Sequence, residues 1–300
     1  KDTETHGASE IVLDVTPIMG IHNIDLLAYC FKQTEEGRNL FRHGMYNEAF
    51  VKFNEASALG YPDAIYNTGV CHMNGYGTEP DSIEAFHHFK RAGNVGHAKA
   101  LHNLAVCHLK GIGTEKNDSL AIATYRKAAI TGYTRSQIAL ADCYLNGIGS
   151  PKDSTAAFEW YRIAAANNEP RALYIIAEQL AIADSTAALD KRALRKSSTI
   201  EYYKKAAKEG NADAQYRLAE FYRTGRYVRK NKKEAFNWYL HAANNNHPLA
   251  AEQVAVCYEK GRGTKKNEKK AVRWYRIALQ NGSELAKEKI DWYDKVHFLE

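Results

Sequence analysis

The chain of 300 residues is 45% hydrophobic and 25% charged, and its formal net charge is +6 at pH 7. These values are ordinary for a soluble globular or repeat protein, and they exclude neither one domain nor two. The apolar run at residues 172–177 is broken by Glu178 and falls far short of the roughly 20 apolar residues that a membrane span needs. The sequence therefore predicts no membrane span.

Two features of the sequence concern the cellular compartment of the protein: the number of cysteines and the residue at which the sequence starts. The 5 cysteines are an odd number without a C-x-x-C pair, which favours a reducing compartment over a disulfide framework. Because the sequence starts at Lys1, a targeting segment upstream of it lies outside what these residues can show.

The charge is unevenly distributed. Residues 1–189 carry 16 Lys and Arg against 21 Asp and Glu, a balance of −5, whereas residues 190–300 carry 25 against 14, a balance of +11. We expect the two ends to differ in the partners they attract.

A unit of about 36 residues is repeated along the chain. Copies begin at 61, 97, 133, 169, 211, 247 and 283, with a single longer interval of 42 residues after 169. Each of the seven copies has a small residue at its fourth place, and five of them later have an apolar pattern of helical period with one aromatic side chain. The small residues are Ala64, Ala100, Ser136, Ala172, Ala214, Ala250 and Ala286, and the aromatic ones are Phe89, Tyr125, Tyr161, Tyr239 and Tyr275.

Glycines and polar residues mark the helix ends within each copy. The first helix is predicted to end at a glycine that adopts a positive φ, namely Gly75, Gly111, Gly147, Gly225 and Gly261. The second is predicted to begin after a capping residue, for which Asp81, Asp118 and Asp153 are candidates. Two helices per copy, stacked side by side, predict an all-α solenoid of helical hairpins.

The pattern also predicts the organisation of the chain. Residues 1–24 form an N-terminal segment and the start of an extra helix, with Thr16 and Pro17 as a helix start. Residues 25–60 form a degenerate hairpin that resembles a tetratricopeptide, 61–282 form six repeats, and 283–300 form a capping helix. The insert at 181–198 is expected to be a mobile loop with one helical turn.

The repeats resemble the Sel1-like family, which is related to tetratricopeptides. The stretches "DAQYRLAEFYRTG" and "AFEWYRIAAANN" carry the resemblance best, and it extends over residues 25–300. It implies a helical solenoid and a non-enzymatic adaptor that binds other proteins, but it says little about which ones.

Within this family the chain is similar to the C-terminal helical domains of the death ligand signal enhancer group. The similarity lies in "GYPDAIYNTGVCHMNGYGTEPDSIEAF", the hairpin "GMYNEAFVKFNEASALG" before it, and "CYEKGRG". It implies a mitochondrial precursor whose cleaved domain collects in the cytosol, self-assembles and activates the haem-regulated kinase that phosphorylates translation initiation factor two. The insert and the basic C-terminal third depart from that group.

Two other adaptor functions stay open. An endoplasmic-reticulum adaptor of the Sel1 type, acting in protein quality control, would carry glycans at the sequons of Asn117 and Asn281. A Sel1-like adaptor with an unrelated partner is the other alternative.

No catalytic, cofactor-binding or metal site is predicted. Cys71, Cys107, Cys143 and Cys257 hold one place in successive copies and are interpreted as small buried residues. The histidines beside two of them, His72 and His108, are interpreted as exposed, because neighbouring residues on a helix cannot face one metal ion. The G-x-G turns lack the strand context of a phosphate-binding loop.

Two surfaces are candidates for binding. The first is a basic edge, for which a solvated surface or a docking site for an acidic protein fits better than nucleic acid, because no aromatic residues are interleaved with the charges. It consists of Arg223, Arg226, Arg229, Lys230, Lys232, Lys233, Lys260, Arg262, Lys265 and Lys266.

The second is an N-terminal apolar set, which either folds back on the first hairpin or forms an interface for a homo-oligomer. It consists of Ile11, Leu13, Val15, Ile18, Met19, Ile24, Leu26 and Leu27.

Overall fold

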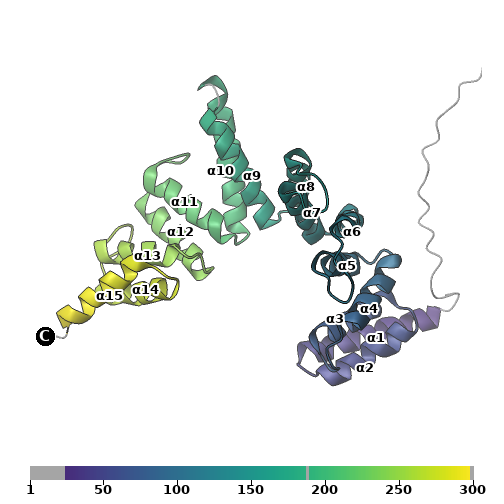
Figure 1. Cartoon of the computed structure of the whole chain (residues 1–300). Helices are drawn as coiled ribbons and strands as arrows, with labels where there is room; N and C mark the ends of the chain where they lie inside the picture. The colour runs from purple at the N-terminus through teal and green to yellow at the C-terminus, as the bar shows by residue number, and fades with distance from the viewer. Residues whose placement is uncertain (1–23, 187–188, 298–300) are drawn as a thin grey trace, which may run out of the picture. The chain divides into compact units, whose positions relative to one another are not determined.

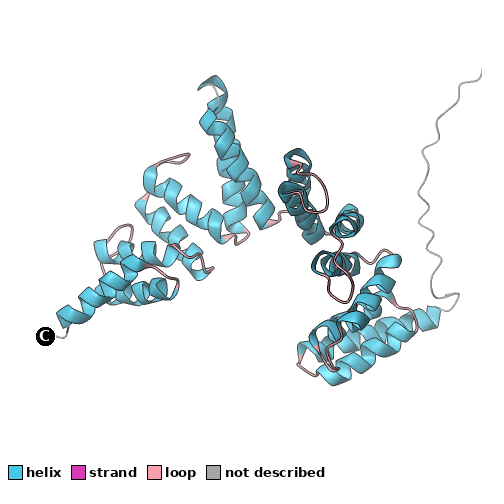
Figure 2. Ribbon diagram, in the orientation of Figure 1, coloured by secondary structure: helices cyan, strands magenta, loops and turns pink. Residues whose placement is uncertain are grey.

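The computed structural model describes residues 24–186 and 189–297, which form helices and loops and no strand (Figure 2). The helices follow one another along the chain as labelled in Figure 1. Their bounds are α1 Ile24–Arg42, α2 Tyr46–Ala58, α3 Pro62–Asn74, α4 Ser82–Asn94, α5 Ala98–Lys110, α6 Asp118–Ile130, α7 Thr134–Asn146, α8 Ser154–Ala166, α9 Pro170–Thr186, α10 Leu189–Lys208, α11 Ala212–Thr224, α12 Lys232–Asn244, α13 Ala250–Lys260, α14 Glu268–Gln280 and α15 Glu284–His297.

The helices divide into two compact units. Residues 1–153, with α1 to α7, form unit 1, and residues 154–300, with α8 to α15, form unit 2. Within each unit every helix packs against the next one along the chain, as in α3 with α4 and α13 with α14. The chain is therefore an all-α solenoid of helical hairpins, as the repeat predicted.

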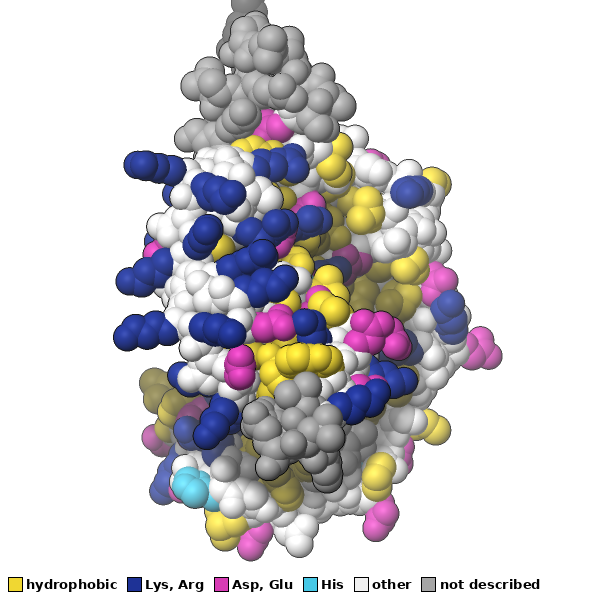
Figure 3. All heavy atoms as spheres, turned by 90° about the vertical axis from the view of Figure 1, so that its left-hand side faces the viewer, with side chains coloured by type: hydrophobic (Ala, Val, Ile, Leu, Met, Phe, Trp, Pro, Cys, Tyr) yellow, Lys and Arg dark blue, Asp and Glu magenta, His cyan; other side chains and the backbone are white. Residues whose placement is uncertain are grey.

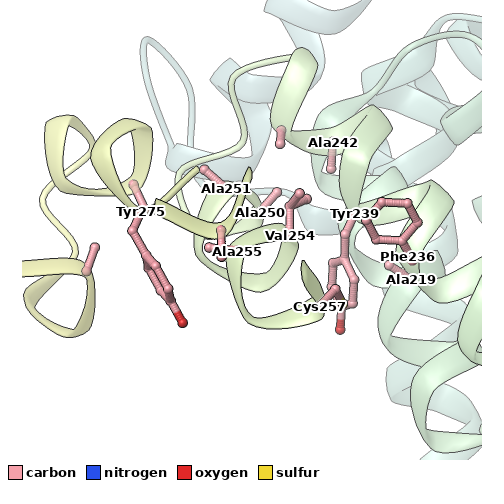
Figure 4. Close-up of a cluster of buried hydrophobic side chains, with 14 of the residues drawn as sticks. Ala219, Phe236, Tyr239, Ala242, Ala250, Ala251, Val254, Ala255, Cys257 and Tyr275 are labelled. Carbon is pink, nitrogen blue, oxygen red and sulfur yellow. The ribbon is translucent and has the colours of Figure 1, made fainter. Parts of the chain in front are cut away.

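Small and aromatic residues build the interior of each hairpin. The seven small residues at the fourth place of each copy are all fully buried, from Ala64 to Ala286. Each predicted aromatic side chain is at most 3% exposed, and Figure 4 shows Tyr239 and Tyr275 among the alanines of the unit 2 core. Alanine lets neighbouring helices approach, and the aromatic ring fills the remaining space.

The loops after α3, α5, α7 and α13 each contain two glycines with different roles, whereas the loop after α11 has Tyr227, with a φ of 62°, in place of the second one. The first, such as Gly261, ends a helix in the left-handed conformation, as predicted. The second also has a positive φ, and it lies against the start of an earlier helix: a Cβ on Gly263 would lie 2.0 Å from the carbonyl oxygen of Lys232. Where the backbone of an earlier helix lies this close, as at Gly113 and Gly263, the second place requires glycine.

The fourth copy differs from the prediction. The described residues of the insert, 181–186 and 189–198, are helical and not a loop: α9 and α10 are 17 and 20 residues long, whereas most other helices have 13. The place of the helix-ending glycine is occupied by Ala183. Without a residue suited to a positive φ, a sequence rich in Ala, Lys and Arg continues the helix.

Two smaller predictions concern helix starts. The N-cap of α6 is Asn117, whose side-chain oxygen accepts a hydrogen bond from the Leu120 amide at 2.9 Å; the prediction of Asp118 was wrong by one residue. The predicted helix start at Thr16 and Pro17 lies outside the described residues.

Candidate functional site

The basic edge is built at the junctions where a helix-ending glycine leads into the next helix. In unit 2 these junctions are residues 225–234, before and into α12, and 261–270, before and into α14. Asn231 and Asn267 cap the two helices, and the contact of Gly263 with the Lys232 backbone sets the second junction against the first residue of α12. Repeat stacking thus brings cations from both junctions together.

The cations of this edge are exposed and mostly unpaired. All ten predicted residues are exposed, and Lys266 pairs with Glu268 at 3.1 Å. Elsewhere in the described part of the two junctions, Arg229, Lys230, Lys232, Lys233 and Lys265 have no carboxylate within ion-pair distance. Figure 3 shows Lys and Arg side chains gathered along one side of the view, beside a hydrophobic strip.

Several cations stand where they oppose the helix dipole. Lys232 and Lys233 open α12, and Lys269 and Lys270 follow Glu268 in the first turn of α14. A helix N-terminus carries a partial positive charge, so each such lysine is unfavourable by about 0.3–1 kcal/mol. Lys269 and Lys270 were absent from the predicted set, although they continue the same run of charge.

Equivalent junctions in unit 1 have the opposite character. Residues 75–84 carry three carboxylates and no cation, and 111–120 carry two carboxylates and one cation; residues 147–156, which run from unit 1 into unit 2, carry one of each. Residues 225–234 and 261–270 each carry five cations and one carboxylate. One structural position is therefore mildly acidic in unit 1 and strongly basic in unit 2.

Arg223 belongs to an internal network and not to the free part of the edge. Its Nε donates to Glu220 at 3.0 Å, and Glu220 also accepts a hydrogen bond from the buried Tyr239. Burial opposes the charged form of Glu220, but the bonds from Arg223 and Tyr239 leave its pKa below the ordinary value. Glu220 therefore joins α11 to the core tyrosine, and Arg223 holds that carboxylate from the same helix.

The N-terminal apolar set is only partly described. Residues Ile11, Leu13, Val15, Ile18 and Met19 lie outside the described residues. Leu26 packs against the cluster of Cys30, Ala56 and Ala64, whereas Ile24 is 82% and Leu27 43% exposed. Phe31, which the prediction omitted, is 55% exposed and follows Ile24 and Leu27 at helical spacing.

Unit 1 contains a cavity of about 470 Å³ that the sequence did not indicate. It lies between α1, α2 and α3, and Arg38, Arg42, Phe53 and Tyr66 are among its lining residues. Arg38 Nη2 donates to Asp63 at 2.7 Å and is held by Glu35 as well, so its charge is satisfied within the fold.

The repeats match a known family model. The Sel1 repeat model matches residues 62–97, 98–132, 134–169, 197–211, 212–247 and 248–283, which is well over half of the chain. The chain belongs to the Sel1 repeat family. The shortened match at 197–211 falls on the lengthened α9–α10 hairpin, where the insert interrupts the usual spacing.

Solved structures agree with this assignment. A Sel1 repeat protein from Oxalobacter formigenes is 28% identical, with a TM-score of 0.72 over 82% of this chain and 99% of that one. A protective antigen of uropathogenic Escherichia coli with an SLR fold is 24% identical, with a TM-score of 0.56 over 88% of this chain and 64% of that one, and shows the fold alone. No curated protein matches the chain.

The Sel1 repeats explain the cysteines, but the two histidines differ from the prediction: His72 is half-buried, with its ring stacked on that of His88. All five cysteines are buried, as expected for the four that share one repeat position. His108 is only 8% exposed and contacts Phe86 edge-on at 5.5 Å, so its predicted exposure was wrong. That place faces the second helix of the preceding Sel1 hairpin; Tyr258 contacts Phe236 in the same way.

Two other kinds of site, a metal centre and a membrane span, are absent from the described residues. Among the described residues, no three His, Cys, Asp or Glu side chains gather where they could hold a metal ion. None of the described helices combines the length and the apolar character of a membrane span.

Proposed function

We propose that this Sel1 repeat protein is a non-enzymatic scaffold that docks an acidic protein surface on the basic edge of unit 2. Sel1 repeats are protein-interaction modules, and their proteins are typically adaptors rather than enzymes. The basic edge supplies the charge that would attract and orient such a partner.

One observation carries this proposal: the edge lysines are placed where they oppose folding. Lys232, Lys233, Lys269 and Lys270 occupy first turns of helices, where a carboxylate would be favourable. The first turns of the equivalent helices α4, α6 and α8 contain no lysine or arginine, so the repeat architecture does not require lysine there. A binding role accounts for charges that the fold itself does not need.

The scaffold is also proposed to self-associate through its N-terminal apolar set. The exposed Ile24, Leu27 and Phe31 support this proposal, because a solenoid end that remains free usually carries polar residues. Phe31→Glu is expected to abolish oligomers without loss of helicity, measured by light scattering and circular dichroism. The matched control is Val51→Glu on α2, which is 53% exposed; an unchanged mass of assembled Phe31→Glu protein would refute this interface.

The most specific form of the proposal names the partner. The resemblance to the death ligand signal enhancer group supports activation of the haem-regulated kinase, in relay of mitochondrial stress, by a domain present in mitochondria and the cytosol. Clustering of bound kinase molecules would raise their local concentration and hence their activation.

The test is phosphorylation of initiation factor two by purified haem-regulated kinase with and without the full chain. Stimulation is expected from the native chain and not from a variant with Lys232, Lys233, Lys269 and Lys270 changed to Glu. The matched control changes Lys116 and Lys152, at the unit 1 junctions, to Glu and should still stimulate. Absence of stimulation by an assembled native chain would remove the kinase as the partner.

A further inference from the structure

A second cavity lies within unit 2, beside the basic edge. It has a volume of about 350 Å³ and is formed by α12, α13 and α14. Its floor is apolar and contains Leu240, Tyr258, Trp274 and Ile277, all partly exposed. A floor of this kind can bury a single large apolar side chain of a ligand.

The rim of the cavity is cationic. Lys270 and Arg273 line it, and Lys270 Nζ stands 5.4 Å from the centre of the Tyr258 ring. In the described part of the chain neither side chain has a carboxylate within ion-pair distance. The cation–π contact holds the lysine over the ring, with its remaining hydrogen-bond donors free for a ligand.

The cavity is continuous with the second junction of the basic edge. Residues 260–280 contain eight cations and a single carboxylate, Glu268, which pairs with Lys266. Along α14 the cations Lys270 and Arg273 are followed by Arg276 on the exposed surface. An approaching acidic segment would therefore meet positive charge on the loop and on the helix that forms the cavity wall.

We propose that this cavity, lined by Leu240, Trp274 and Ile277 and rimmed by Lys270 and Arg273, anchors an acidic protein segment by one large apolar side chain. The carboxylates on both sides of that side chain pair with Lys270, Arg273 and the junction lysines. This inference rests on the proposed docking of an acidic partner, and it adds the residue type that distinguishes a true partner from any polyanion.

The chemistry favours a peptide over a nucleic acid. A phosphate backbone would use the cations but leave the aliphatic floor of Leu240 and Ile277 uncovered. An apolar side chain that leaves water for this floor strengthens binding by about 10- to 100-fold over charge alone. Specificity thus comes from the cavity, and the surrounding charge supplies long-range attraction.

The experiment measures binding of two blocked, fluorescein-labelled poly-glutamate peptides to the full chain by anisotropy. The peptides have equal length and charge and differ only in a central Phe or Gly. The native chain is expected to bind the Phe peptide at least about 10-fold more tightly. The paired changes Leu240→Ser and Ile277→Ser should abolish this preference yet preserve binding of the Gly peptide.

The matched control is Leu279→Ser on α14, a 39% exposed leucine outside the cavity, which should preserve the preference. Circular dichroism verifies that the variants fold. Arg273→Glu, at an exposed residue, provides a second variant, which is expected to weaken binding of the Phe peptide more than binding of the Gly peptide.

Equal affinity for both peptides would overturn the cavity proposal and leave the basic edge as a charge-only docking surface. A Phe preference that survives in the cavity variant, or tighter binding of a single-stranded RNA, would overturn it as well. Failure of both peptides to bind would remove the cavity and the basic edge together.

Discussion

Units 1 and 2 share one packing scheme and differ on their surfaces. Both bury alanine at the same repeat places and an aromatic ring in each hairpin, yet unit 1 carries 14 cations against 17 carboxylates and unit 2 carries 27 against 18. The difference is concentrated in the charged side chains of the junctions, none of which is buried. The buried residues of a Sel1 hairpin and the glycines of its loop determine the fold, whereas the charges of the junctions differ between the units without any change in this packing.

The aromatic side chains show a second difference between the units. In unit 1 two of them are Phe53 and Phe89, whereas Tyr203 and Tyr275 of unit 2 donate hydroxyl hydrogen bonds to Glu178 at 2.8 Å and Glu259 at 2.9 Å. A buried hydroxyl requires a partner, and the carboxylate provides it. Unit 2 therefore combines apolar packing with polar bonds between successive helices.

The largest effect is expected where both units are alike. Gly113→Ala and Gly263→Ala each add a Cβ 2.0 Å from a carbonyl oxygen, that of Ser82 or Lys232, at a positive φ. Each should lower the free energy of unfolding by about 3–5 kcal/mol, because the backbone must shift. The control Gly210→Ala, with positive φ but open space, should cost about 1 kcal/mol. Denaturant-dependent hydrogen exchange measures each unit, and equal costs at all three glycines would contradict the close contact.

The second-largest effect is expected at low pH, which should destabilise unit 1 more than unit 2. Burial lowers the pKa of His88 and His102 in unit 1 to about 4, and it lowers the pKa of His108 as well; in unit 2 the pKa of His247 is lowered. Unfolded histidine titrates near 6.5, so between these values the unfolded state binds more protons. The contribution of these histidines to the free energy of unfolding is therefore fully present above about pH 6.5, and it decreases as the pH falls toward 4.

Between pH 6.5 and pH 5, the free energy of unfolding of unit 1 is expected to fall by about 1 kcal/mol for each of His88 and His102. This value allows for the partial exposure of the two side chains. Hydrogen exchange at pH 5 and pH 7, corrected for intrinsic rates, follows both units at once. His88→Gln with His102→Gln should flatten the slope of unit 1. An equal loss in unit 2 would show that these histidines do not govern the response.

Removal of one hydroxyl should affect unit 2 alone. Tyr239→Phe leaves the ring in place but deprives Glu220 of a hydrogen bond, so unfolding of unit 2 should become easier by about 1–2 kcal/mol. Burial, followed by the bond to Glu220, raises the pKa of Tyr239 strongly, which predicts no phenolate absorbance below the alkaline unfolding transition. Unchanged stability of Tyr239→Phe would mean that the bond contributes nothing net.

The smallest effect should be a gain of stability. Lys232→Gln with Lys269→Gln removes two cations from helix N-termini and should stabilise unit 2 by about 0.3–1 kcal/mol for each lysine at low salt. The increase in Tm should shrink as salt is added. A decrease in Tm at all salt concentrations would show that these lysines support the fold, which would remove the argument for a binding role.

Much of the fold was predictable from the sequence, because its signals are local and repeated. Glycine ends a helix wherever it stands in register, and the alanine places mark the buried seam. The long α9–α10 hairpin was predicted as a loop because the composition of the insert is typical of loops. The feature that decides its structure is that Ala183 stands where other copies have the glycine that ends the helix. The burial of His108 was missed because its neighbour Phe86 belongs to another hairpin.

The candidate site was only half predictable. The run of lysines can be recognised in the sequence itself, whereas the cavity beside it is lined by Leu240, Tyr258 and Trp274 from three different helices. No spacing in the sequence predicts that these three side chains lie close together in the fold. Likewise, Arg223 belongs to the same run of charge, and only its bond to Glu220 distinguishes it from the unpaired cations of the basic edge.

Hydrogen–deuterium exchange of the full chain, with and without a poly-glutamate peptide carrying a central Phe, tests the central claim most directly. Docking on the basic edge predicts slower exchange over 226–233 and 262–280 in unit 2 and no change at the unit 1 junctions. Protection confined to unit 1, or none despite measured binding, would contradict the assignment of the partner surface to unit 2.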